Sequence, residues 1–247
     1  MKSLEPAHSR DYLAFDHEIA RLIPEGRDDW KTFRPFGISC AAVMDRTGAP
    51  KLWHGHTLQG VPAERMSRDE VSALVGYLDA EVRSGKTILT WNGAGFDFDV
   101  LAEESGMLET CARLAAGHVD MMFHFFCLKG FALGLDKAAQ GMSLPGKTKG
   151  MDGSKAPLYW QEGRFQEVLE YVSQDVAATL QVCLAVEKSH SLRWVTSRGT
   201  SQILPFPTGW LTVEDAARLP LPDTSWMRSP WPRSRFTGWM PGFSHDR

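Results

Sequence analysis

The segment DYLAFDHEIA (residues 11–20) says most about how this chain folds. Its apolar and polar residues alternate as they do in a β-strand. Asp16 and Glu18 are two positions apart, so both point to one face of the predicted strand while His17 points to the other. Like charges on one face of a central strand repel each other and lose hydration. Either a divalent cation neutralises them, or this is an edge strand whose acids face water.

Two further β-rich runs follow. They are FGISCAAVMD (residues 36–45) and KLWHG (residues 51–55), joined by the turn RTGAP. Strands joined in this way predict an antiparallel meander that starts with residues 11–20.

A helix and a buried strand come next. Ser67 and Glu70 form a capping box at the start of a helical pattern that Gly85 ends. The apolar run TILTWN (residues 87–92) is typical of a buried strand, and the longest helical pattern covers residues 160–189. These elements predict an α/β fold with a mixed sheet flanked by helices.

A second group of acids follows the buried strand, in WNGAGFDFDVL (residues 91–101). The glycine-rich turn places Asp97 just beyond the carboxyl end of the strand, where α/β proteins bind their ligands. Asp97 and Asp99 are also what a helix N-terminus favours electrostatically, which is the alternative interpretation. From the residues alone, either acid could act as a ligand.

A third group lies on the long predicted helix, in YVSQDVAATL (residues 171–180). Tyr171 and Asp175 are four residues apart and share one face of the helix. Their helical neighbours are apolar, which indicates an inward-facing side, although the same spacing is also common in surface pairs.

The ordered set FDHE (residues 15–18), NGAGFD (residues 92–97) and YVSQD (residues 171–175) resembles the motifs of the DEDD exonuclease superfamily. The tyrosine in the third motif is similar to that of the Tyr-containing subgroup. Each motif is weak by itself, but their order and their expected secondary structure make the set fairly specific.

The segments HVDMMFHFF (residues 118–126) and LGLDKAAQGMSLPGK (residues 133–147) also resemble the linking region of such domains, including the proofreading exonuclease domains of family B DNA polymerases. The resemblance implies an RNase H-like fold. We expect an exonuclease domain over residues 1–190 and a Pro-, Trp- and Arg-rich C-terminal extension over residues 191–247.

The resemblance also implies an activity: 3′–5′ hydrolysis of single-stranded DNA or RNA from its 3′ end, releasing nucleoside 5′-monophosphates. Two divalent cations, Mg²⁺ or Mn²⁺, would take part. By similarity, Asp16 would bridge the two ions, Glu18 and Asp175 would complete the first site, and Asp97 would serve the second. Tyr171 would orient the attacking water or help to deprotonate it.

Further residues are candidate substrate contacts. Asn92 either fixes the turn or touches substrate. Trp91 and Phe98 either stack on a terminal base or pack in the core. Lys147 and Lys149 either meet phosphates or belong to a solvated loop.

Several other polar residues are expected to be structural. His17 faces away from the acids, and His118 and His124 are expected to be packed or on the surface. Asp120 is expected to cap a helix rather than to act as a fifth metal ligand.

The charge of the chain is unevenly distributed. The 247 residues carry a net charge of −3, which argues against binding nucleic acid through bulk positive charge. Residues 1–191 carry −6 and residues 192–247 carry +3, with five of the nine tryptophans and seven of the 14 prolines in this last part. It either wraps the domain, binds a single strand or forms an interface with a protein partner.

No signal peptide or 20-residue apolar span is visible, and the four cysteines form no CxxC pair, so we expect a cytoplasmic protein without membrane contact. Two other functions remain open: a non-catalytic module that binds nucleic-acid ends, and an endonuclease on a related fold.

Overall fold

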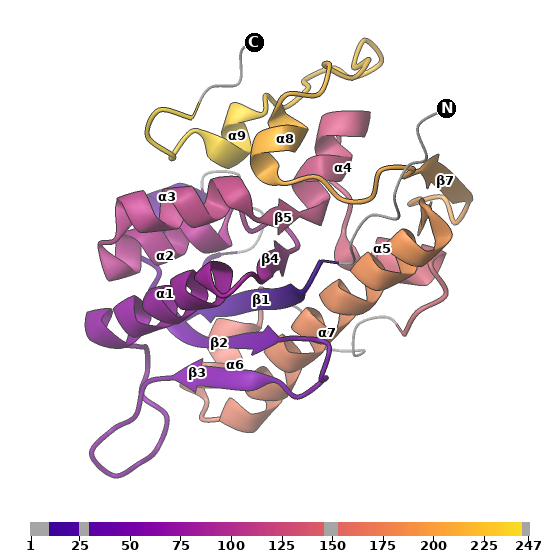
Figure 1. Ribbon diagram of the computed structural model, residues 1–247. Coiled ribbons are helices and arrows are strands. Elements are labelled where there is room, and N and C mark those ends of the chain that lie inside the picture. Colours follow the sequence, from indigo (N-terminus) through magenta and orange to yellow (C-terminus); the bar gives the residue numbers. More distant parts are fainter. Residues whose placement is uncertain (1–9, 25–29, 146–152, 244–247) are drawn as a thin grey trace.

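The computed structural model describes residues 10–24, 30–145 and 153–243 (Figure 1). The strands are β1 (Tyr12–Ile19), β2 (Ile38–Met44), β3 (Lys51–His54), β4 (Thr87–Thr90), β5 (Val119–Asp120), β6 (Ser191–Val195) and β7 (Ser201–Pro205). The helices are the 3₁₀ turn η1 (Trp30–Phe33), α1 (Arg68–Arg83), α2 (Asp97–Ser105), α3 (Leu108–Gly117), α4 (Met121–Lys129), α5 (Leu135–Gly141), α6 (Ala156–Gln161), α7 (Phe165–Ser189), α8 (Val213–Ala217) and α9 (Ser234–Thr237).

Five strands form one mixed sheet in the order β3-β2-β1-β4-β5. β1, β2 and β3 pair antiparallel, as the meander predicted, whereas β4 is parallel to β1 and β5 is parallel to β4. The predicted mixed α/β fold is therefore confirmed. β1 lies at the centre of this sheet, so the alternative of an edge strand with solvated acids is wrong.

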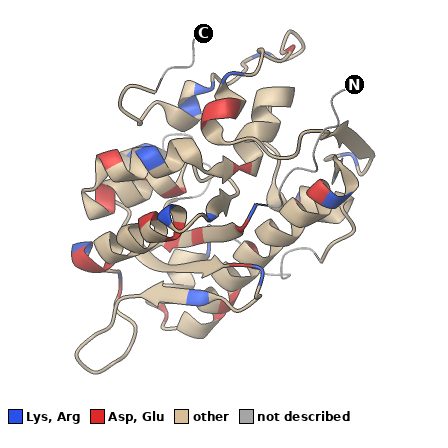
Figure 2. Ribbon diagram, viewed as in Figure 1, with Lys and Arg blue, Asp and Glu red and all other residues tan. Residues whose placement is uncertain are grey.

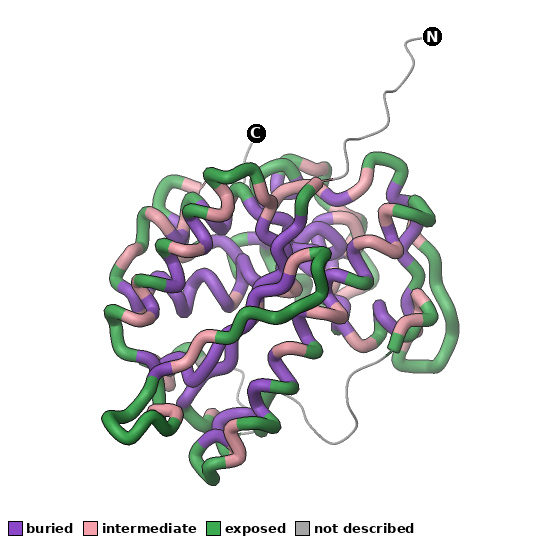
Figure 3. The backbone as a smooth tube through the Cα atoms, turned by 60° about the horizontal axis from the view of Figure 1, so that its bottom comes forward, coloured by how far each residue is buried: buried purple, intermediate pink, exposed green. Residues whose placement is uncertain are grey.

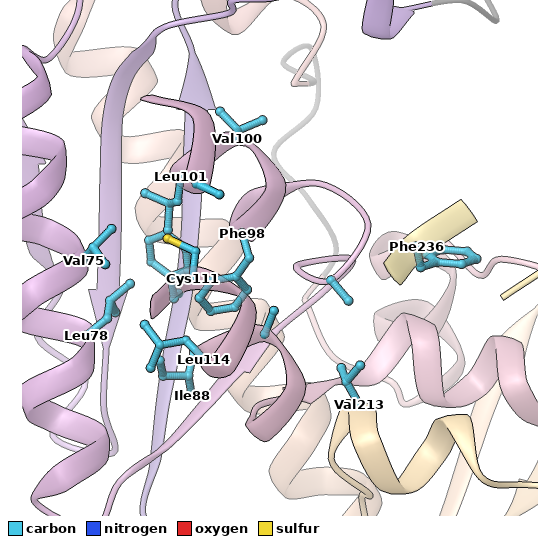
Figure 4. Packing of buried hydrophobic residues seen from close by; sticks show 14 of the residues in the cluster. Val75, Leu78, Ile88, Phe98, Val100, Leu101, Cys111, Leu114, Val213 and Phe236 are labelled. Carbon is cyan, nitrogen blue, oxygen red and sulfur yellow. The ribbon is translucent and has the colours of Figure 1, made fainter. Parts of the chain in front are cut away.

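Helices cover both faces of the sheet, with α1, α2 and α3 on one side and α7 on the other (Figure 1). Side chains of β1 alternate between the two cores: Leu13 and Phe15 pack on the α1 side, Tyr12 and Ala14 on the α7 side. Figure 4 shows α1, α2 and α3 meeting the sheet in the first core. The buried segments run through the middle of the molecule and the exposed ones lie on its outer loops (Figure 3).

The ends of the helices follow local sequence signals. Ser67 and Glu70 form the predicted capping box of α1, and Gly85 follows the helix with a φ of +103°. The long predicted helix was placed too early. α7 begins at Phe165, because Gly163 adopts a φ of +77° after α6 and separates the two helices. Among the described residues, no helix is both long and apolar enough to cross a membrane.

The C-terminal segment, residues 191–243, packs onto the rest of the chain. It begins with the antiparallel hairpin β6-β7, which the sequence patterns did not reveal. Leu192 and Trp210 enter the core on the α7 side, and Val213 and Phe236 enter the core on the α1 side. Both hydrophobic cores are therefore built partly from this segment.

A buried arginine holds this segment in place. Arg233 is 7% exposed. Its Nη1 donates hydrogen bonds to the carbonyls of Ala217 at 2.7 Å and Leu219 at 2.6 Å. Its Nη2 donates to the carbonyls of Pro220 at 2.9 Å and Cys127 at 3.3 Å. One guanidinium thus joins the chain before α9 to the ends of α8 and α4.

We expect Arg233→Met to lower the free energy of unfolding by about 2–4 kcal/mol, because hydrogen bonds from a charged group are lost and buried carbonyls are left unpaired. Urea or thermal unfolding measures the change, about 5–15 °C in Tm for a chain of this size. Arg228→Met, at an exposed position of the same segment, should change the free energy by less than about 0.5 kcal/mol. Equal effects of the two substitutions would contradict the anchoring role.

Three of the histidines in the described ranges are buried, and burial lowers the pKa of His17, His118 and His124 to about 4. The two His118 nitrogens lie 2.9 Å from Thr90 Oγ1 and 2.7 Å from the Ala115 carbonyl. The packed role expected for His118 and His124 is confirmed.

These histidines predict a loss of stability in acid. Unfolded histidine binds a proton near pH 6.5, so between about pH 6.5 and 4 the unfolded state binds more protons, and the free energy of unfolding falls as the pH falls. In His124→Gln, the loss measured between pH 7 and pH 5 should be smaller by roughly 1–2 kcal/mol. His56→Gln, at an exposed histidine, is the control and should keep the wild-type loss. An unchanged loss in His124→Gln would contradict this assignment.

Candidate metal centre

Three acids from two elements meet on the α7 side of the sheet. Asp16 and Glu18 are on β1 and Asp175 is on α7, and one ligand oxygen of each lies within 4.8 Å of the others. Figure 2 shows acidic residues within β1, in the middle of the sheet. Val172 and Val176 bury the same side of α7 in the adjacent core, which fixes Asp175 against β1. The structure therefore joins the first and third sequence motifs.

Tyr171 lies one helical turn before Asp175 and is also buried. Burial raises the pKa of its hydroxyl above the usual value, and the charges of Asp175, Glu18 and Asp16 raise it further. Gly153 lies close to both side chains, since a Cβ added to it would be 3.8 Å from Glu18 Oε2 and 3.9 Å from Tyr171 Oη. Tyr171 is thus a neutral phenol placed beside the carboxylates.

Asp97 is beside this group rather than within it. It starts α2 and is buried, and burial, followed by the charges of Asp16 and Asp120, raises its pKa well above the usual value. Its Oδ1 is buried and accepts no hydrogen bond from the described residues, with His17 Nε2 3.7 Å away. Asp16 therefore stands between Asp97 and the pair formed by Glu18 and Asp175.

Asp120 shapes the turn that positions Asp97. Its Oδ1 accepts hydrogen bonds from the backbone N–H groups of Asn92 at 3.0 Å and Phe123 at 2.9 Å, and its Oδ2 accepts one from Ala94 at 2.9 Å. Asn92 adopts a φ of +80° there. The expected role of Asp120 as a helix cap is confirmed. Its hydrogen bonds to the Asn92 turn were not predicted, because they join segments that are distant in the sequence.

Asp99 does not belong to the cluster. Its carboxylate is paired with Arg34 at 2.5 Å and Lys31 at 3.1 Å. These two cations compensate the charge of Asp99. Of the two acids after the turn, Asp97 is therefore the one that lies near Asp16.

An acidic cavity of about 480 Å³ opens over the cluster. Besides the four residues Asp16, Glu18, Tyr171 and Asp175, its lining includes Trp91, Asn92 and Arg21. Arg21 donates hydrogen bonds from Nη1 to the carbonyls of Phe33 at 2.7 Å and Pro35 at 3.3 Å. Arg21 lies two residues after β1, and this position could have suggested that it is near the site. The sequence analysis did not predict it, because it belongs to none of the three acidic motifs.

The residues predicted to contact substrate differ in where the structure places them. Phe98 is 0% exposed and packs on the rings of Phe15 and His118, so its predicted contact with substrate is wrong and the alternative of core packing is correct. Trp91 and Asn92 line the acidic cavity. Lys147 and Lys149 lie outside the described residues.

The donor set fits hard divalent cations. It consists of carboxylates, with no cysteine among the clustered ligands, and oxygen donors are what Mg²⁺ and Mn²⁺ prefer. The buried, unpartnered Oδ1 of Asp97 gives the same indication, because an ionised oxygen is costly to bury without a cation or donor. Asp16, Glu18 and Asp175 are the residues that would hold an ion, with Asp97 beside them.

Comparison with known proteins relates part of this chain to exonuclease domains. Residues 108–193 match a family described as "Predicted 3'-5' exonuclease related to the exonuclease domain of PolB". The matched part includes Tyr171 and Asp175 but begins after β1 and after Asp97. No curated protein matches the sequence.

The fold is similar to that of the family B DNA polymerase from the hyperthermophilic archaeon Pyrobaculum calidifontis, with a TM-score of 0.52 and 18% sequence identity. The similarity covers 72% of this chain and 24% of the polymerase, so the chain corresponds to about a quarter of that protein. This likeness is consistent with the RNase H-like fold expected from the motifs.

Metal binding should stabilise the protein. We expect Mg²⁺ or Mn²⁺ at about 100 times its Kd to raise the free energy of unfolding by about 2.7 kcal/mol over the protein in EDTA. Asp175→Asn should remove most of this gain and leave the metal-free protein at least as stable as wild type, because one like charge is gone. Thermal unfolding with and without the ion measures both effects.

Glu167→Gln supplies the matched control, since Glu167 is an exposed acid on the same helix, paired with Arg164. It should keep the wild-type response to metal. A full metal response in Asp175→Asn would show that the ion binds elsewhere.

Proposed function

We propose that this protein is a metal-dependent 3′–5′ exonuclease of single-stranded DNA or RNA that releases nucleoside 5′-monophosphates. The observation that carries the proposal is the meeting of Asp16, Glu18 and Asp175 within 4.8 Å in one cavity, with Tyr171 beside them. The match of residues 108–193 to a family of predicted exonucleases supports a nuclease function independently of that geometry.

We assign the metal ligands from the positions of the acids. Asp16 would bridge two ions, because it neighbours both Asp97 and the cluster with Glu18 and Asp175. Two Mg²⁺ or Mn²⁺ ions would neutralise the phosphate oxygens and make a bound water more acidic. Glu18 and Asp175 would complete one ion site and Asp97 the other.

Tyr171 would orient the attacking water. Burial and three nearby carboxylates raise its pKa, so the phenol keeps its proton and serves as a hydrogen-bond donor rather than as a base. On this basis we propose that the chain belongs to the Tyr-containing subgroup of the DEDD exonucleases. Arg21, in the lining of the same cavity, adds a positive charge that would attract the substrate phosphate.

End-labelled single-stranded DNA and RNA, incubated with Mg²⁺ or Mn²⁺, test the proposal. We expect stepwise shortening from the 3′ end and mononucleotide products. Asp16→Asn should lower kcat by about 10²- to 10³-fold or more, since it removes electrostatic stabilisation of the transition state, and Tyr171→Phe by about 10²-fold. Glu167→Gln should retain wild-type activity.

Equal residual degradation by wild type and Asp16→Asn would refute the catalytic assignment. Tight binding of 3′ ends without metal, together with no cleavage when metal is present, would instead identify the non-catalytic end-binding module. Cleavage of a closed circular single strand would identify an endonuclease.

A further inference from the structure

A second cavity, of about 570 Å³, lies next to the acidic cavity, and Asn92 lines both. One side of the second cavity comes from the region of the site and the other from the C-terminal segment. Its lining residues are Lys31, Asn92, Gly95, Met122, Ala132, Trp231, Ser234, Arg235 and Phe236.

The C-terminal wall is attached directly to the turn that carries the second acid motif. Trp239 Nε1 donates a hydrogen bond to the Ala94 carbonyl at 2.7 Å. A Cβ added to Gly95 would lie only 2.9 Å from Phe236 Cδ1, so the turn and α9 are in close contact. The second cavity is therefore held in a defined position relative to Asp97.

The lining of the second cavity has the chemistry that single-stranded nucleic acid requires. The Arg235 guanidinium lies 3.9 Å from the centre of the Trp231 ring, and Trp231 is 45% exposed. Lys31, which lies outside the C-terminal segment, adds another cation to the lining and is paired with Asp99 at 3.1 Å. An exposed aromatic ring stacks on bases without regard to sequence, and neighbouring cations attract phosphates.

We propose that the two cavities form one substrate groove, in which the second cavity binds the nucleotides on the 5′ side of the bond to be cleaved. This inference rests on the exonuclease function proposed above and names the strand-binding part of that site. The 3′ end would lie over Asp16, Glu18 and Asp175, and the strand would pass Asn92 to reach Trp231 and Arg235. A protein partner fits less well, because the cavity shares Asn92 with the acidic site and is lined by Lys31 and Arg235.

The length of the substrate tests the groove. A dinucleotide occupies little beyond the acidic cavity, whereas a longer strand reaches Trp231. For the longer strand, Trp231→Ala should lower kcat/KM by about 5- to 150-fold, the range found for the loss of one base–aromatic stack. The loss with the dinucleotide should be clearly smaller. Arg235→Ala should reduce the salt dependence of strand binding by about one unit of log K against log salt concentration.

Two exposed residues of the same segment, Trp226 and Arg228, lie outside the lining and give matched controls. Trp226→Ala and Arg228→Ala should leave both length dependence and salt dependence unchanged. The groove is refuted if the Trp231 and Arg235 variants behave like these controls, as they would if a protein occupied the second cavity. It is also refuted if both substrate lengths lose activity equally.

Failure of the groove and failure of the exonuclease function can be told apart. If wild type cleaves neither substrate, the function fails, and fluorescence anisotropy of a labelled strand with Ca²⁺ still measures whether Trp231→Ala and Arg235→Ala weaken binding relative to their controls. If wild type cleaves both substrates and the variants match the controls in both assays, only the groove fails.

Discussion

Burial of like charges in the central strand is the constraint on which the rest of the structure depends. β1 has strands on both sides and hydrophobic cores on both faces, yet its α7 side carries Asp16 and Glu18, with Asp175 brought against them. Such a group loses hydration and gains repulsion, so it persists only where surrounding packing offsets the cost. Val172 and Val176 on α7, together with the core under α1, α2 and α3, provide that packing. Burial raises the pKa of Asp97 and Tyr171, and the neighbouring acids raise it further.

Local patterns predicted much of the fold and the candidate site. The alternation in residues 11–20, the capping box at Ser67 and the order of the acidic motifs are all readable within short windows, and the structure brings Asp16, Glu18 and Asp175 together. The helix break at Gly163 was missed because no proline marks it and a single glycine can also lie within a helix. Phe98 was open to two interpretations because a residue beside a site motif can face either core or cavity. The hydrogen bonds from Asn92 and Ala94 to Asp120 join segments more than 20 residues apart, so no short window contains them.

The excess positive charge of the C-terminal segment is divided between different tasks. Arg233 is buried and its guanidinium donates four hydrogen bonds to backbone carbonyls, whereas Arg235, two residues later, is exposed over an indole ring. The net charge of the segment counts both arginines equally, although one is buried and the other is exposed. Only the second is available to a phosphate, so the overall charge of −3 says little about the local field next to the acidic cavity.

The hydrogen bond from Trp239 to Ala94 has a consequence for the time at which the site is completed. During synthesis the ribosome adds Asp16, Asp97 and Asp175 long before it adds Trp239. Until that residue arrives, the turn between β4 and α2 lacks both the indole donor and the Phe236 ring that packs beside Gly95. The growing chain thus holds its acids without the wall that completes their surroundings. The centre is therefore complete only after Trp239 has been synthesised.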